Sequence, residues 1–87
     1  MLRTYDAKII QKCSFDEREI REATLDVLYD KVYIEPEDIV YEVIEQILIW
    51  SGMMYDNLNA VTFAANNPEL YNGVITIINE VLADEAI

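Results

Sequence analysis

The chain has 87 residues, 53% of them hydrophobic, and a formal net charge of −11. This length indicates one acidic domain over residues 1–87, and the hydrophobic content excludes a disordered chain despite the charge. Because the sequence has no histidine and a single cysteine, Cys13, it excludes a serine–histidine triad, histidine- or cysteine-based zinc sites and an internal disulfide.

The N-terminal segment, residues 1–13, carries no clear start signal. Its stretch "TYDAKIIQKC" suits a short helix or a strand-like arm, and we favour the helix. The segment lacks the apolar run and small-residue cleavage site of a signal peptide. The only candidate membrane span is interrupted by Glu42, Glu45 and Gln46, whereas a bilayer requires about 20 mostly apolar residues. We therefore expect a soluble, cytoplasmic protein (in the host cytoplasm if viral) without membrane binding.

The first main helix is predicted over about residues 15–33. It begins with a capping box, Ser14-x-x-Glu17, and Glu17 and Arg21 are spaced as a favourable i,i+4 ion pair. Cys13 is expected to be a small buried residue beside this start. The positions that recur at helical spacing are Ile20, Ala23, Thr24, Val27, Leu28 and Lys31.

Two further helices are punctuated by proline, which fits the first helical position. Pro36 begins a helix over 36–50 that ends before Gly52, and Pro68, with Asn67 as cap, begins a helix over 68–84. The apolar set of this last helix is Leu70, Val74, Ile77, Ile78, Val81 and Leu82.

A shorter helix is predicted over 54–66, with Leu58, Val61 and Ala65 on its apolar face. Gly73 lies inside the last helix, where glycine is less favourable than alanine by about 1 kcal/mol, and so indicates a kink or a close crossing. Together these elements predict an all-α fold, a compact bundle of four main helices with a short N-terminal helix or arm.

The helix over 36–50 is unusually apolar. At about 100° per residue its hydrophobic positions cover an arc of roughly 200°, twice what packing on one side requires. The helix is therefore either central, with contacts on two sides, or one half of its arc serves a partner chain. These positions are Ile39, Val40, Tyr41, Val43, Ile44, Ile47, Leu48 and Trp50.

The charges are distributed unevenly. All six basic residues lie in the first 31 positions, which sum to −1 because seven acids lie there too, whereas ten acids and no cation follow Lys31. Direct nucleic-acid binding is therefore not expected, because phosphate recognition requires clustered Lys and Arg. A basic protein surface would be attracted.

The acidic residues form two predicted ridges. Asp38, Glu42 and Glu45 follow i, i+4, i+7 spacing on the second helix, with Tyr41 at the ridge edge as an aromatic anchor. The first helix carries a similar series, Glu19, Glu22, Asp26 and Asp30. These eight residues are the candidate partner-binding residues, and the alternative is a solvated face that only aids solubility.

We expect neither catalysis nor a cofactor or metal. The pattern Glu19-x-x-Glu22 followed by Glu35-x-x-Asp38 offers oxygen ligands suited to magnesium. However, an antiparallel pair of helices would separate the two carboxylate pairs by about 15–20 Å.

Two functions therefore remain as hypotheses. The first is a small acidic inhibitor that occupies a basic, nucleic-acid-binding surface of a target protein; phage anti-defence proteins, DNA mimics and immunity proteins share this physical profile. The alternative is a structural or assembly module that forms a helical homo-oligomer through the helix at 36–50.

Overall fold

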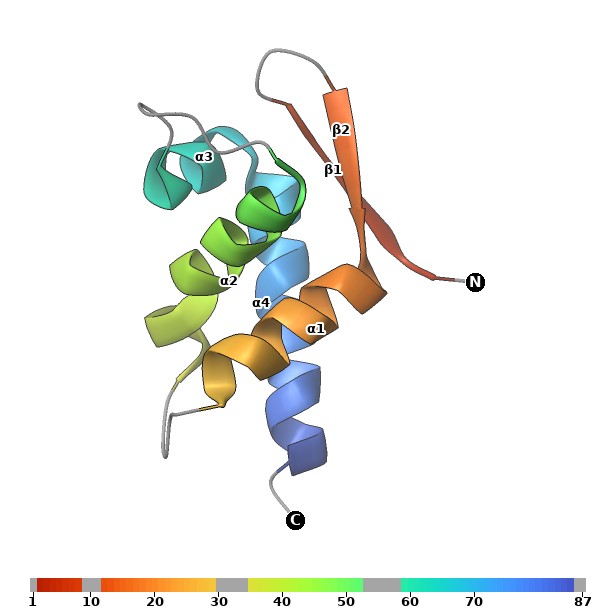
Figure 1. Ribbon diagram of the computed structural model, residues 1–87, viewed down its shortest axis with the longest axis vertical. Helices are drawn as coiled ribbons and strands as arrows, with labels where there is room; N and C mark the ends of the chain where they lie inside the picture. The colour runs from red at the N-terminus through yellow and green to blue at the C-terminus, as the bar shows by residue number, and fades with distance from the viewer. Residues whose placement is uncertain (1, 9–11, 30–34, 53–58, 86–87) are drawn as a thin grey trace.

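The computed structural model describes residues 2–8, 12–29, 35–52 and 59–85. Its elements, in chain order, are β1 (Thr4–Lys8), β2 (Lys12–Asp16), α1 (Glu17–Leu28), α2 (Pro36–Trp50), α3 (Ala60–Asn66) and α4 (Pro68–Glu85) (Figure 1). The described chain is mostly helical, and the prediction of four helices is confirmed. The prediction of a wholly α-helical fold misses a two-stranded sheet.

The N-terminal segment forms an antiparallel hairpin, so the helix favoured there is wrong. In its register Tyr5 pairs with Phe15 and Ala7 pairs with Cys13. These side chains alternate with exposed polar ones, and Phe15 and Ala7 are buried while Tyr5 and Cys13 pack partly buried against the core. Alternation with a period of two places this apolar face on the helices and leaves the other face to solvent.

Helix α1 begins later than predicted, because Ser14 and Phe15 belong to β2. The N-cap is Asp16, whose carboxylate accepts a hydrogen bond from the Glu19 N–H at 2.9 Å. Glu17 is bound by Arg3 rather than serving Ser14 in a capping box. The predicted face of α1 is correct as far as the structure describes it: Ile20, Ala23 and Thr24 are buried and Val27 and Leu28 are half-buried, while Lys31 lies outside the described residues.

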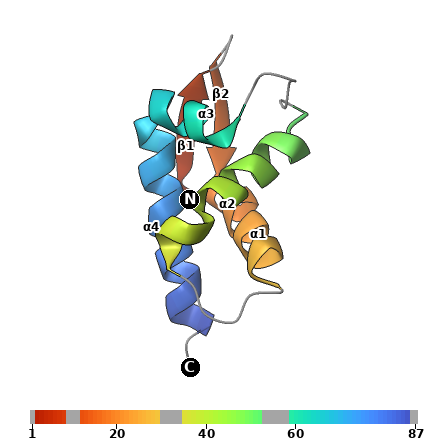
Figure 2. The ribbon, with the colours of Figure 1, turned by 90° about the vertical axis from the view of Figure 1, so that its left-hand side faces the viewer.

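Helix α2 is central, as one of the two interpretations of its wide apolar arc required. It packs against α1, α3 and α4, and Figure 2 shows it lying across α1 and α4. Two of its eight arc positions, Tyr41 and Trp50, are partly exposed. The other six are fully buried: Ile39, Val40, Val43, Ile44, Ile47 and Leu48. The predicted bounds of this helix and its proline start are confirmed.

Helix α3 turns a different face inward from the one predicted. It begins at Ala60 after an Asn59 cap, whose side chain accepts from the Thr62 N–H at 2.8 Å. Ala60, Phe63 and Ala64 are buried, whereas Val61 is 56% exposed. The predicted Leu58 lies outside the described residues. Because one phenylalanine buries more surface than a valine, its position decides the orientation of this short helix.

Helix α4 carries the predicted apolar face, of which all but the half-buried Leu82 is buried. Asn67 precedes it, but its side chain is not used as a cap of α4. Its amide oxygen accepts from the Lys8 N–H at 2.8 Å, and its amide nitrogen donates to the carbonyls of Lys8 and Phe63. Asn67 thus ties β1 to the end of α3.

The glycine inside α4 marks a close crossing, with β1 rather than with another helix. A Cβ placed on Gly73 would lie 2.7 Å from Cγ of Tyr5 and closer still to two other ring atoms. The absence of a side chain at Gly73 therefore allows the hairpin to lie against α4. Among the helices that the structure describes, none is both long and apolar enough to cross a membrane.

Candidate functional site

The two predicted acidic ridges lie on neighbouring helices, α1 and α2. The helices pack against each other in antiparallel directions, and the Ser51 hydroxyl after the end of α2 lies 3.3 Å from the Glu19 carboxylate near the start of α1. Glu22 and Asp26 follow Glu19 at helical spacing along the same flank of α1. Both are exposed. We define the α1–α2 face by its acidic residues and two apolar ones: Glu19, Glu22, Asp26, Asp38, Glu42, Glu45, Ile49 and Trp50.

The ridge on α2 is exposed along its whole length, because Asp38, Glu42 and Glu45 all face solvent. Asp38 also has a structural role, since its carboxylate accepts from the Glu35 N–H at 3.2 Å in a capping box. Replacing Asp38 would therefore disturb the helix start as well as the charge of the surface. Of the predicted ridge on α1, Asp30 lies outside the described residues.

Glu19 is the most constrained carboxylate of this face. Partial burial raises its pKa above the ordinary value, and the nearby negative charges of Asp16 and Glu22 raise it further, while the Ser51 hydroxyl partly opposes them. Glu19 also lies at the C-terminal end of α2, where the helix dipole is negative. Glu19 is also in the first turn of α1, whose dipole favours a negative charge, but the net effect of its surroundings is a raised pKa, so the ionised form is disfavoured.

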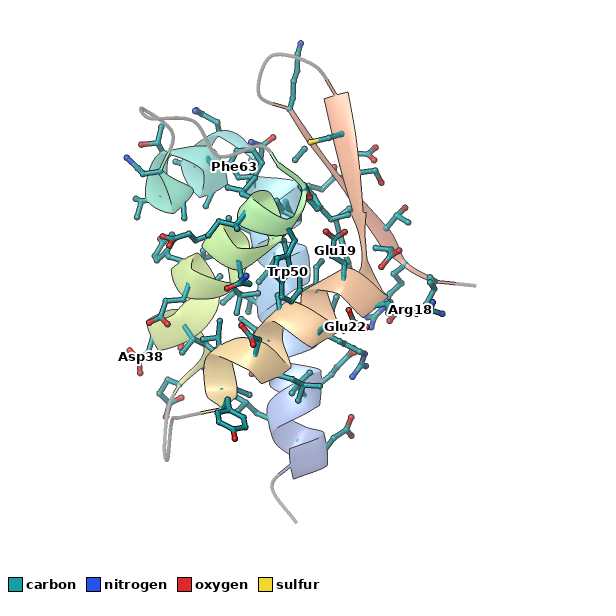
Figure 3. The ribbon with its side chains drawn as sticks, in the orientation of Figure 1. Arg18, Glu19, Glu22, Asp38, Trp50 and Phe63 are labelled. Atoms are coloured by element: carbon teal, nitrogen blue, oxygen red, sulfur yellow. The ribbon has the colours of Figure 1, made fainter. Side chains whose placement is uncertain are left out.

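Trp50 is the residue of this face that sequence reasoning assigned to the core arc. It is 46% exposed, and its neighbour Ile49 is 49% exposed. Figure 3 shows the indole beside α1, close to the labelled Glu19 and Glu22. Helical spacing did not predict this exposure, because Ile39 lies farther out on the arc and is buried; Trp50 is the last residue of α2.

Arg3, which precedes β1, and Arg21 of α1 form ion pairs away from the α1–α2 face. Arg3 donates to Glu17 at 2.8 Å and to Glu80 at 2.6 Å, and Arg21 binds Glu80 at 2.9 Å and approaches Asp84 at 3.7 Å. These contacts join β1, α1 and α4 on the flank of α1 opposite to Glu19. Hydrogen bonds from Arg3 lower the pKa of both Glu17 and Glu80.

The predicted i,i+4 pairing of Arg21 with Glu17 is therefore replaced by longer-range pairing across the fold. Arg18, one turn before Glu22, makes no ion pair with it within the described structure. Glu22, Asp26 and Glu45 likewise have no ion-pair partner among the described residues.

The carboxylate pattern considered for magnesium is separated in space. Glu19 lies beside Ser51, whereas Asp38 belongs to the first turn of α2, thirteen positions earlier. At 1.5 Å per residue this corresponds to about 20 Å. The two pairs therefore do not converge on one ion.

Tyr41 lies at the opposite border of α2 from Trp50. It is 38% exposed, and its ring centroid is 6.0 Å from that of Tyr71 on α4, with the planes at 43°. Together with Val61, Ala64, Ala65 and Pro68, these rings line a groove of about 250 Å³ between α2, α3 and α4. We call it the Tyr41–Tyr71 groove. Tyr41 thus lies partly exposed at the border of the buried face of α2.

Comparisons of the chain with protein-family models, with curated proteins and with solved structures found no match. A functional proposal must therefore rest on the features of the protein surface. This surface offers two acidic helix flanks, an exposed tryptophan between them and a tyrosine-lined groove on the far side of α2.

Proposed function

We propose that this protein is an acidic inhibitor whose α1–α2 face occupies a basic, nucleic-acid-binding surface of a partner protein. The observation that carries the proposal is the acidic flank of α1 beside the end of α2, where Trp50 is exposed, while Arg3 and Arg21 are paired on the other flank of α1. Carboxylates of this kind steer a cationic partner and fix its orientation.

Trp50 gives this face an exposed aromatic side chain that can contribute binding energy, which a face that only aids solubility does not need. Tryptophan is among the residues that most often carry binding energy at protein interfaces, and its ring also attracts arginine and lysine. The carboxylates of Glu19 and Glu22 on the neighbouring flank of α1 suit a partner rich in these cations. Inhibitors of the phage anti-defence, DNA-mimic or immunity type present carboxylates where nucleic-acid phosphates would bind, and we place this chain in that functional class.

The alternative, a homo-oligomer through α2, is left with little exposed apolar surface. Most of the apolar residues of α2 are buried within the chain, and only Tyr41, Ile49 and Trp50 are exposed. The carboxylates of Asp38, Glu42 and Glu45 lie on the same exposed surface and would repel their own copies.

The test is capture of a partner from cell lysate, followed by a binding assay with matched variants. The double variant Glu22→Gln/Glu45→Gln removes two charges from the face, and Glu69→Gln/Asp84→Asn removes two charges elsewhere. We expect the first to weaken binding of the captured protein about tenfold at low salt, from roughly 0.5–1 kcal/mol per exposed charge pair. The second should leave the affinity nearly unchanged.

The captured protein should also bind nucleic acid, and this chain should displace that nucleic acid in an electrophoretic shift assay. Binding should weaken as ionic strength rises, because exposed ion pairs are screened. Equal losses in the two double variants would assign the effect to net charge and would contradict a specific face. Simultaneous binding of nucleic acid and this chain would refute inhibition by occupancy.

A further inference from the structure

The Tyr41–Tyr71 groove has two unlike ends. The rings of Tyr41 and Tyr71 form one wall, and the small apolar side chains of α3 and the start of α4 form the rest. Its volume of about 250 Å³ is roughly that of eight waters. It therefore has room for a single long side chain and not for a helix or a strand.

A negative charge stands at the tyrosine end. Glu37 is exposed and lies four residues before Tyr41, so the two side chains are neighbours on the same face of α2. Its charge also acts on α4: desolvation raises the pKa of the Tyr71 hydroxyl, and the proximity of Tyr41 and Glu37 raises it further. Glu37 is thus close to both rings.

We propose that the Tyr41–Tyr71 groove binds one arginine side chain of the basic partner. The aliphatic stem would lie along Val61, Ala65 and Pro68, and the guanidinium would face the tyrosine rings and Glu37. Arginine combines an apolar stem with a weakly hydrated planar cation that stacks on aromatic faces, which matches both ends of the groove. This inference rests on the proposed function, because it assigns a recognition element to the partner.

Other occupants match the groove less well. A leucine or methionine side chain would fill the apolar part and leave the Glu37 carboxylate without a counter-charge. A second copy of the chain would bring a further net charge of −11, and two of its three arginines, Arg3 and Arg21, are already paired.

The experiment uses two small probes that differ only in charge. N-acetyl-arginine N-methylamide and its neutral analogue N-acetyl-citrulline N-methylamide are titrated into the isotope-labelled protein, and the resonances of Val61, Tyr41 and Tyr71 are followed by NMR. We expect saturable shifts with the arginine probe and about fivefold weaker binding of the citrulline probe.

Three variants test whether the arginine probe binds in the Tyr41–Tyr71 groove. Tyr41→Leu should abolish the shifts at Val61, and Glu37→Gln should weaken the arginine probe several-fold without changing the citrulline probe. Glu22→Gln is the matched control, because it removes the same charge from an exposed position on α1, which does not line the groove. The amide spectrum of each variant shows whether it has kept its fold.

Several results would overturn the inference. Equal binding of the two probes would make the groove a merely apolar pocket, and no shift at Val61 would mean that it takes neither. Shifts caused by protein concentration alone would assign the groove to a second copy. The probes carry no partner surface, so their failure would leave the result of the α1–α2 face variants to decide the proposed function separately.

Discussion

Replacing Gly73 by alanine tests how the hairpin is seated on the helices. In an isolated helix this change is favourable by about 1 kcal/mol. Here the new methyl group would lie 2.7 Å from Cγ of Tyr5, at the base of the ring, where a rotation of the far end of the side chain gives no relief. Overpacking of this kind costs about 1–3 kcal/mol. We therefore expect Gly73→Ala to lower the free energy of unfolding by about 1 kcal/mol, equivalent to a melting temperature lower by roughly 4–8 °C.

The same substitution should have the opposite sign once the ring is removed. In a Tyr5→Ala background the space is open, and Gly73→Ala should then stabilise the protein by about 1 kcal/mol through helix propensity alone. The assay is thermal and urea unfolding of the four proteins of this cycle, followed by circular dichroism. Asn79→Ala, at an exposed position of α4, is the control and should have the same small effect in both backgrounds. Stabilisation by Gly73→Ala in the wild-type background would refute the close crossing.

Three further predictions concern the core and the charges. Ile44→Asp or Leu48→Asp should abolish the native melting transition, because an unpaired buried charge costs several kcal/mol, whereas Ile49→Asp should melt nearly as the wild type does. Glu19→Gln should raise the melting temperature at pH 7, and the gain should vanish below about pH 4.5, because the folded protein favours the neutral side chain there. Arg3→Met should flatten the loss of stability on acidification below pH 4.5, since the carboxylates it binds have lowered pKa values and stabilise the fold only while ionised.

Proline starts and long apolar patterns were the parts of the fold that the sequence predicted well. The bounds of α2 and the buried face of α4 follow from Pro36, Pro68 and helical periodicity, because long periodic segments leave little choice of orientation. Residues 1–13 were misjudged because the alternation in β1 is short and includes the small Ala7. Its partner strand confirms the pattern only through Cys13 and Phe15, which pair with Ala7 and Tyr5.

The start of α1 shows how two local signals compete. Ser14-x-x-Glu17 and Asp16-x-x-Glu19 both resemble the start of a helix, and the second is used. The choice is made by tertiary contacts: Phe15 is buried as part of β2, and Glu17 is bound by the backbone and side chain of Arg3. Neither contact can be found from local sequence, because they join residues far apart in the chain.

The candidate face was predicted in its residue types rather than in its geometry. Helical spacing located the two ridges, but only packing brings Glu19 beside Ser51 and Trp50 between the helices. The groove beside Tyr41 was beyond prediction for a similar reason. It exists because α3 buries Phe63 and leaves Val61 exposed, which depends on where a seven-residue helix begins.

The position of Glu19 bears on whether the face has a function or only aids solubility. A carboxylate needed for solubility alone is best placed at an exposed position far from other acids. Glu19 lies in the first turn of α1, but it is partly buried beside two further acids at the C-terminal end of α2, and the net effect raises its pKa. Proteins keep such unfavourable groups where they serve binding, so stability and activity trade off at these positions. Glu19→Gln therefore separates the alternatives: a functional face requires that the stabilised variant bind its partner more weakly, whereas for a solvated face it would gain stability without losing affinity.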